Sequence, residues 1–189
     1  MKFCVAALVL LILSNIALSQ RDYFTNEEVE LIRDAQQIDK RVDIEVHAMD
    51  RRFGALNIGV NAPAYKEVGD WGTAPSGSRF ELLQDIKHIL QKSIDDIDNL
   101  SERPSSMVIE EPEDKKKKPK GFAEVFPNAV RNLAAAARRY QPVFKTELDT
   151  SKDPAEKGLI LNSLEMCDEI IAAAAKLPAA PLDPKASKH

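Results

Sequence analysis

Apolar residues recur at every third or fourth position through four long segments of this chain, residues 25–53, 77–102, 126–149 and 153–177. That spacing places them on one face of an α-helix, whereas a half-buried strand alternates at every second position. Each apolar stripe has to be buried against another, and an antiparallel four-helix bundle is the simplest arrangement that does so. We therefore expect an all-α fold built from four long amphipathic helices.

Helix-start signals support three of these segments. In a capping box, two side chains three residues apart each accept a hydrogen bond from a backbone N–H at the start of the helix. The pairs with this spacing are Thr25 with Glu28, Ser78 with Glu81, and Asp153 with Glu156. Pro142 falls inside the third segment, where a proline has no N–H to donate and its ring clashes with the preceding turn. We expect Pro142 to kink or interrupt that helix.

Two long connections separate the predicted helices. Residues 54–76 contain four of the seven glycines and predict a long Gly-rich loop. Residues 103–121 contain three prolines and a run of lysines at 115–118, which predicts a disordered Lys-rich linker. The connection after the third segment is short, so we expect the third and fourth helices to form an antiparallel hairpin. Residues 178–189 predict a disordered tail.

The first 19 residues have the pattern of a signal peptide. Lys2 is followed by an unbroken apolar run from Val5 to Leu13, and small residues precede Gln20. We expect cleavage near Ser19 and Gln20, and export to a periplasm or to the extracellular space. The apolar run is shorter than the roughly 20 residues of a membrane span, so we expect no stable membrane insertion after cleavage.

Residues 20–177 are long enough to form a single helical-bundle domain with its own core. Cys4 would leave with the signal peptide, so Cys167 would be the one remaining thiol and no intramolecular disulfide could form. Because Cys167 lies on the apolar stripe of the fourth segment, we expect a buried, inert thiol. The chain has 30 acidic and 26 basic residues, which disfavours nucleic acid as a partner.

Several acidic and histidine side chains could carry chemistry. Four of them follow one side of the first segment, next to its apolar stripe: Asp39, Asp43, His47 and Asp50. Asp43 and His47 are four residues apart and could share a metal ion. We expect an ordinary solvated helix flank instead, because no second helix offers matching ligands. Asp85 and His88 lie opposite the apolar stripe of the second segment and are expected to face water.

Asp95, Asp96 and Asp98 crowd the last turns of the second segment, where the helix dipole favours positive charge. Lys115–Lys118 folding back, or a loosely held cation, could offset this repulsion. An exposed acidic patch is the simpler interpretation. We therefore predict no metal site here.

Trp71 is the only tryptophan of the chain, and it lies in the predicted Gly-rich loop. A large aromatic residue in such a loop either anchors the loop to the bundle or contacts a partner, because loops on rigid scaffolds often carry function. Tyr65 lies in the same loop and would share either role. We keep Trp71 and Tyr65 as candidate partner-contact residues.

No catalytic, cofactor-binding or nucleotide-binding motif occurs in the sequence, and we expect no cofactor. The best hypothesis is an exported, non-enzymatic helical-bundle protein that binds a partner, such as another protein, or acts as a structural component. The alternative is a four-helix bundle that binds a small ligand or a metal ion. An enzyme ranks lowest, because catalytic carboxylates need burial to shift their pKa values and no acidic residue lies on a predicted core stripe.

Overall fold

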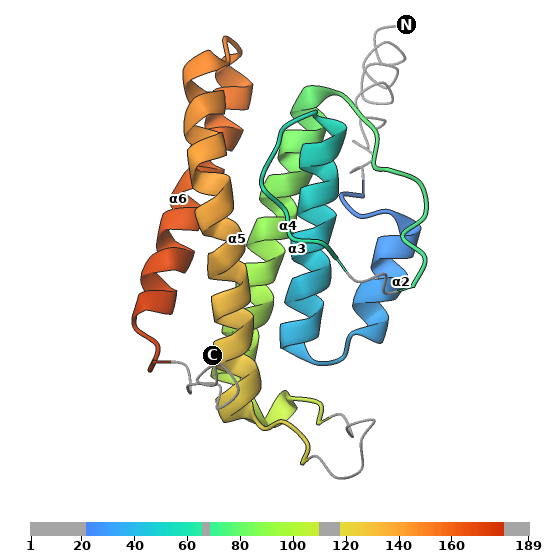
Figure 1. Ribbon diagram of the computed structural model, residues 1–189, viewed down its shortest axis with the longest axis vertical. Coiled ribbons are helices and arrows are strands. Elements are labelled where there is room, and N and C mark those ends of the chain that lie inside the picture. The colour runs from blue at the N-terminus through green and yellow to red at the C-terminus, as the bar shows by residue number, and fades with distance from the viewer. Residues whose placement is uncertain (1–21, 66–68, 110–117, 180–189) are drawn as a thin grey trace, which may run out of the picture.

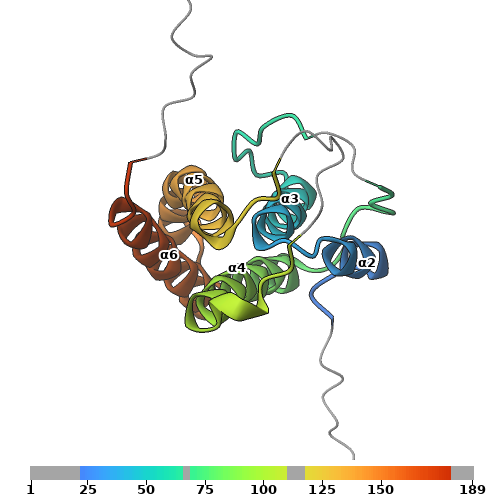
Figure 2. The same ribbon diagram turned by 90° about the horizontal axis from the view of Figure 1, so that it is seen from below.

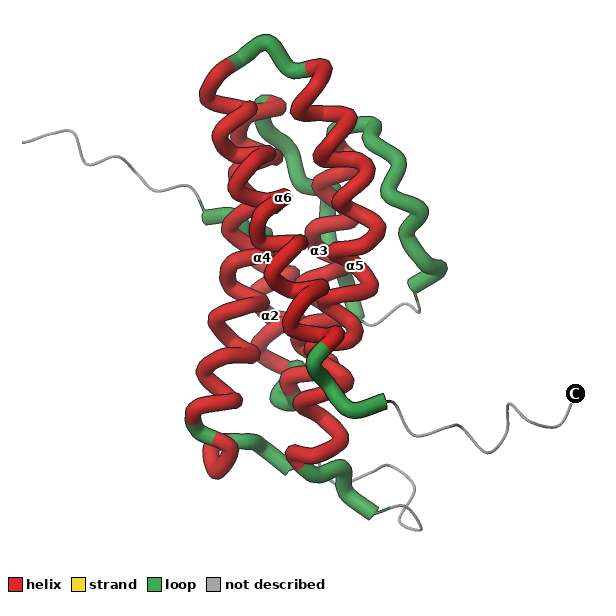
Figure 3. The backbone as a smooth tube through the Cα atoms, turned by 90° about the vertical axis from the view of Figure 1, so that its left-hand side faces the viewer, coloured by secondary structure: helices red, strands yellow, loops and turns green. Residues whose placement is uncertain are grey.

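A computed structural model describes residues 22–65, 69–109 and 118–179 of the chain (Figure 1). The described residues form helices and connections but no strand (Figure 3), so the predicted all-α class is confirmed. The elements are α2 (Asn26–Asp34), α3 (Ile38–Ala55), α4 (Arg79–Glu102), the 3₁₀ helix η1 (Pro104–Ser106), α5 (Phe122–Thr150) and α6 (Pro154–Ala175). The predicted signal peptide and residues 180–189 of the predicted tail lie outside the described residues. Of the predicted linker, η1 is described, whereas residues 110–117 are not.

Four of the helices pack around one core. When the molecule is viewed along its long axis, α3 contacts α4 and α5, and α6 contacts the same two helices from the other side (Figure 2). The shorter α2 lies outside this group and packs on α3. The main core is made by the inward faces of α3, α4, α5 and α6.

Cross-helix pairs fix the helix directions. Between α3 and α4 the paired residues run in opposite directions, Arg41 with Asp96 and Arg52 with Asp85. Between α3 and α5 they run in the same direction, Asp43 with Asn132 and Asp50 with Arg139. The predicted arrangement with all neighbours antiparallel is therefore wrong, because α5 begins at the end of the bundle where α3 also begins and the two neighbours run parallel (Figure 1).

The prediction of one continuous helix over residues 25–53 is wrong, because the chain breaks at residues 35–37 into α2 and α3. Its predicted capping box at Thr25 and Glu28 does form. In one continuous helix, Glu28 and Arg52 would lie about 36 Å apart at 1.5 Å per residue. In the structure, α2 folds back along α3 and a carboxylate oxygen of Glu28 lies 2.7 Å from a guanidinium nitrogen of Arg52. The break therefore allows a long-range ion pair that a straight helix could not make.

The bounds of α4 and α6 lie within two residues of the predicted ones, but α5 begins at Phe122, four residues before the predicted start at residue 126. The predicted capping box at Ser78 and Glu81 starts α4. The box predicted at Glu156 does not form, because this carboxylate accepts hydrogen bonds from Arg79 and Ser151 instead. The predicted interruption at Pro142 is also wrong, since α5 continues through it to Thr150.

Pro142 is tolerated inside α5 because tertiary packing holds the helix on both sides of it. Tyr140 and Phe144 are fully buried in the core, and the Pro142 ring is exposed. The Thr146 hydroxyl donates to the Pro142 carbonyl oxygen at 3.1 Å, which adds a local bond in the turn that follows Pro142. Packing of this kind routinely overrides a local helix propensity.

Cys167 is completely buried, as predicted, and burial raises the pKa of its thiol to about 12. A thiol with this pKa stays protonated in neutral solution and is a poor nucleophile. Cys167 is therefore a packing residue of α6.

Buried acidic residues are the main correction to the sequence analysis. The carboxylates of five residues are buried in or beside the core: Glu28, Asp39, Glu45, Asp50 and Asp85. The predicted solvated flank of α3 is therefore wrong for Asp39 and Asp50, and the predicted exposure of Asp85 is wrong as well. The reason is that basic partners come from elsewhere in the chain, as in the 3.7 Å approach of Arg52 to Asp85.

Glu45 is the buried carboxylate with the weakest support. It is completely buried between α3 and α4, and neither of its oxygens accepts a hydrogen bond from the described residues. The ammonium group of Lys92 lies 3.8 Å away. Burial raises the pKa of Glu45 from 4.5 to about 7; the nearby Ser93 side chain, Lys92 and Arg41 oppose this shift, and Asp96 adds to it.

We expect this pKa to make the protein less stable as pH rises. The folded state binds more protons than the unfolded chain between the unfolded pKa of 4.5 and the folded pKa of about 7. The free energy of unfolding should therefore fall across that window and stop falling above it. Glu45→Gln should flatten this slope and raise stability at pH 8 by about 1–3 kcal/mol.

Urea unfolding at pH 5, 6, 7 and 8 measures the effect, with the exposed Glu165→Gln on α6 as the matched control. An unchanged slope in Glu45→Gln would contradict the role given to this carboxylate.

Candidate functional site

The connection between α3 and α4 is much longer than the gap it bridges. The end of α3 and the start of α4 lie at the same end of the bundle (Figure 1). Instead of joining them directly, residues 56–65 run back beside α3 and α5, and residues 69–78 pass α2 on the way to α4. This connection therefore covers the outer face of α3.

Two glycines allow this connection to lie directly on α2. Gly69 and Gly72 have positive φ angles of 72° and 59°, a conformation that favours glycine. A Cβ atom at Gly69 would lie 2.7 Å from the side chain of Leu31, and one at Gly72 would lie 2.6 Å from that of Glu27. The glycine positions therefore fix where Trp71, between them, can sit.

Trp71, His47 and Tyr65 form an aromatic wall. The Tyr65 ring stacks on the His47 ring with centroids 3.8 Å apart and an angle of 8° between the planes. The Trp71 ring lies 4.0 Å from His47 on a tilt of 56°. The guanidinium carbon of Arg51 is 5.4 Å from the Trp71 ring, which adds a cation–π contact. Burial lowers the pKa of His47, and the positive charge of the nearby Arg51 lowers it further, so the imidazole is neutral at pH 7.

Asp50 holds Tyr65 in the aromatic wall. The Tyr65 hydroxyl donates to Asp50. The same carboxylate accepts from the Tyr140 hydroxyl at 2.7 Å and from the Arg139 guanidinium at 3.0 and 3.2 Å. Arg139 also donates to the backbone carbonyl of Val60 at 3.2 Å. Burial and the Asp50 carboxylate raise the pKa of Tyr65, so its hydroxyl stays protonated.

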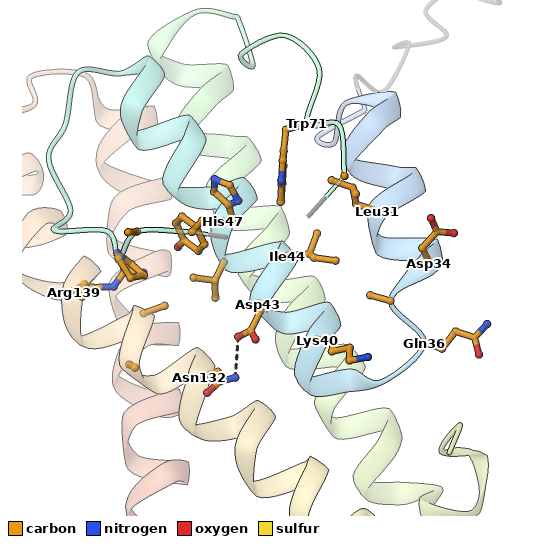
Figure 4. A pocket seen from close by; sticks show the side chains of 18 residues that line it. Leu31, Asp34, Gln36, Lys40, Asp43, Ile44, His47, Trp71, Asn132 and Arg139 are labelled. Carbon is orange, nitrogen blue, oxygen red and sulfur yellow. Dashed lines mark hydrogen bonds between the residues drawn. The ribbon is translucent and has the colours of Figure 1, made fainter. Parts of the chain in front are cut away.

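An open pocket of about 1150 Å³ lies between α2, α3, α5 and this loop (Figure 4). Its walls include Leu31 and Ile44, which belong to a small apolar cluster separate from the main core. Alanines at positions 35, 64, 135 and 136 line it as well, and their short side chains leave the space open. The aromatic wall closes one side.

A few polar groups complete the pocket. Asp43 lies on the α3 side, and its carboxylate accepts a hydrogen bond from the Asn132 amide of α5 at 2.8 Å (Figure 4). Asp34 and Lys40 line the pocket from the end of α2 and the start of α3. A largely apolar cavity with a few polar groups is the usual form of a small-molecule site.

The structure brings the two candidate contact residues, Trp71 and Tyr65, together on this pocket. It does not bring Asp43 and His47 together as metal ligands: Asp43 bonds to Asn132, and His47 is stacked between rings. Among the described residues, no three His, Cys, Asp or Glu side chains are grouped in a way that could hold a metal ion. Sequence reasoning missed Asn132 and Arg139, which have no local signal because each meets α3 across 89 positions of the chain.

The predicted acidic patch near the end of α4 is partly neutralised. Asp96 pairs with Lys92 at 2.7 Å and with Arg41 at 3.3 Å. Asp95 accepts a hydrogen bond from Gln91 at 2.9 Å. Lysines 115–117, which could have folded back here, lie outside the described residues.

Comparison with known protein families, curated proteins and solved structures finds no match to this chain. Within the part of the chain that the structure describes, no helix is both long enough and apolar enough to cross a membrane.

Proposed function

We propose that this is an exported, non-enzymatic helical-bundle protein that binds a small, largely apolar molecule in the pocket lined by Trp71 and Tyr65. The observation that carries the proposal is the pocket of about 1150 Å³ with its aromatic wall and apolar floor. Typical ligand pockets measure roughly 300–1,000 Å³ and combine apolar walls with a few polar groups. In this proposal α3, α4, α5 and α6 serve as a four-helix scaffold, to which α2 and the loop add the binding site.

The bonding of the polar groups favours binding over catalysis. Arg139 and Tyr65 are both engaged by Asp50, and Asp43 is oriented by Asn132. The faces of the neutral His47 ring are used for aromatic contacts. These groups position the walls of the pocket, which is what a binding site needs.

A protein partner is the second candidate. The pocket is open to solvent, so a side chain of another protein could enter it and contact Trp71. Trp71 is half-buried, and aromatic residues are enriched in protein interfaces. Binding of a free small molecule separates the two candidates.

Because Trp71 is the only tryptophan, intrinsic fluorescence reports on the pocket directly. We expect the neutral dye N-phenyl-1-naphthylamine to bind with one-to-one stoichiometry, quench Trp71 emission and become brighter itself. Trp71→Ala should weaken binding of the dye by tenfold or more. Because this variant has no tryptophan, the emission of the dye measures its binding. A tenfold loss corresponds to about 1.4 kcal/mol, within the range expected for one aromatic contact.

A pocket-filling variant tests the location without removing a wall. Ala135 lines the pocket with an exposed side chain, so Ala135→Phe should occupy the space and leave the core intact. The matched control is Ala172→Phe, at an exposed position of α6 away from the pocket. Equal dye affinity in the two variants would place the dye elsewhere and contradict the proposal.

A further inference from the structure

The pocket lining carries more free negative than positive charge. Among the described residues that line it, two are acidic, Asp34 and Asp43, and two are basic, Lys40 and Arg139. The Arg139 charge is already matched, because its guanidinium bonds to both oxygens of the buried Asp50. The neutral His47 adds no charge at pH 7. Within the described lining, two carboxylates thus face one ammonium group, that of Lys40, while Lys120 and Asp39 outside the lining act on Asp43 with opposite signs.

Asp43 is the carboxylate best placed to meet a ligand. Its Oδ1 atom accepts from the neutral Asn132 amide, which orients the carboxylate without cancelling its charge. Its Oδ2 atom makes no hydrogen bond to the described residues. Desolvation by the surroundings raises the pKa of Asp43, and the hydrogen bond from Asn132 lowers it. The Asp43 side chain is exposed, so the ammonium group of a ligand in the pocket can reach it and form a charge-assisted hydrogen bond.

The aromatic wall lies one helical turn from Asp43. Asp43 and His47 occupy positions four residues apart on α3, so their side chains leave the helix about 5–6 Å from each other. The rings of Trp71 and Tyr65 contact His47 on this side. A ligand that reaches both features needs a ring and a cationic group separated by a short chain.

We infer that the pocket binds arylalkylamines, with the ring against the aromatic wall of His47, Tyr65 and Trp71 and the ammonium group at Asp43. The inference rests on the proposed function and names its ligand class. The ammonium donates to Asp43 Oδ2, and the ring replaces water on the Trp71 and Ile44 surfaces. A carboxylate on the same ring would be repelled by Asp43 and Asp34.

Three ligands with the same ring test the charge preference. Isothermal titration calorimetry at pH 7 would compare 2-(1-naphthyl)ethylamine, 2-(1-naphthyl)ethanol and 1-naphthylacetate. We expect the amine to bind at least tenfold more tightly than the alcohol, and the carboxylate to bind more weakly than both. Asp43→Asn should remove the tenfold advantage of the amine and leave the affinity for the alcohol unchanged. Asp149→Asn, an exposed position at the far end of α5, is the matched control.

The outcomes separate the two proposals. If the alcohol or the carboxylate binds as tightly as the amine, or if Asp43→Asn leaves the amine affinity unchanged, the amine inference is overturned and the pocket proposal stands. If N-phenyl-1-naphthylamine binds but none of the three ligands does, the amine inference is again overturned alone. If neither the dye nor any of the three ligands binds, both proposals fall.

Discussion

Glu28→Ala is expected to lower the free energy of unfolding by about 3–5 kcal/mol, because it leaves a buried arginine without its main counter-charge. The Glu28 side chain is completely buried between α2 and α3. Its oxygens accept hydrogen bonds from Arg52 at 2.7 and 2.9 Å and from Arg51 at 2.7 Å. One of them also accepts from the backbone N–H of Thr25 at 3.0 Å. A single carboxylate thus caps α2 and fixes it to α3.

The exposed pair on the same helix supplies the control. Glu30 and Arg33 lie 2.6 Å apart, but about two thirds of each side chain is exposed to solvent. Water screens such a pair, so Glu30→Ala should cost well under 1 kcal/mol. Urea unfolding of the two variants measures the difference. Equal stability losses would show that the buried pair does not hold α2 in place.

Loss of Glu28 should also affect the pocket, since Leu31 and Asp34 of α2 form one of its sides. We therefore expect Glu28→Ala to weaken dye binding even under conditions in which the four longer helices remain folded. This coupling distinguishes a pocket that needs α2 from one formed by α3 and α5 alone.

Apolar periodicity predicted the helices well because each long helix buries one continuous stripe. The α4 boundaries and the capping boxes at Thr25 and Ser78 follow from side chains that act within one turn. The break between α2 and α3 could not be predicted in this way. Neither glycine nor proline marks residues 35–37, and the pattern of apolar residues continues across them. What favours the break is the pairing of Glu28 with arginines more than twenty residues away.

The same limit applies to the pocket. Trp71 and Tyr65 could be chosen from the sequence because large aromatic residues in a glycine-rich loop are conspicuous. The sequence of α3 predicts solvent exposure for Asp39 and Asp50, because their basic partners lie in other parts of the chain. Asn132 and Arg139 become neighbours of α3 only through its parallel packing with α5, and that packing depends on how the long connections cross the bundle. The chemical type of each side chain can be read from the sequence. Which side chains meet in a binding site depends on the directions in which the helices pack.

Asp50 connects the scaffold to the aromatic wall, and its removal should affect both stability and binding. Its side chain is buried and accepts hydrogen bonds from Tyr140, Arg139 and Tyr65 at once. Tyr140 is completely buried, and its hydroxyl would keep only the longer contact to the Val46 carbonyl at 3.3 Å. Arg139 would lose its counter-charge while partly buried.

We expect Asp50→Ala to cost about 2–4 kcal/mol, since the loss of a buried acceptor leaves several donors unsatisfied. Tyr140→Phe removes only one hydroxyl and should cost about 1 kcal/mol. Tyr65→Phe should lower the free energy of unfolding less than Asp50→Ala does. It should nevertheless loosen the loop, because the ring at position 65 is then held by stacking on His47 alone. Urea unfolding ranks the three variants, and amide hydrogen exchange over residues 56–65 reports on the loop. If Asp50→Ala proved no more destabilising than Tyr140→Phe, or left exchange in the loop unchanged, Asp50 would not be what joins the aromatic wall to α5.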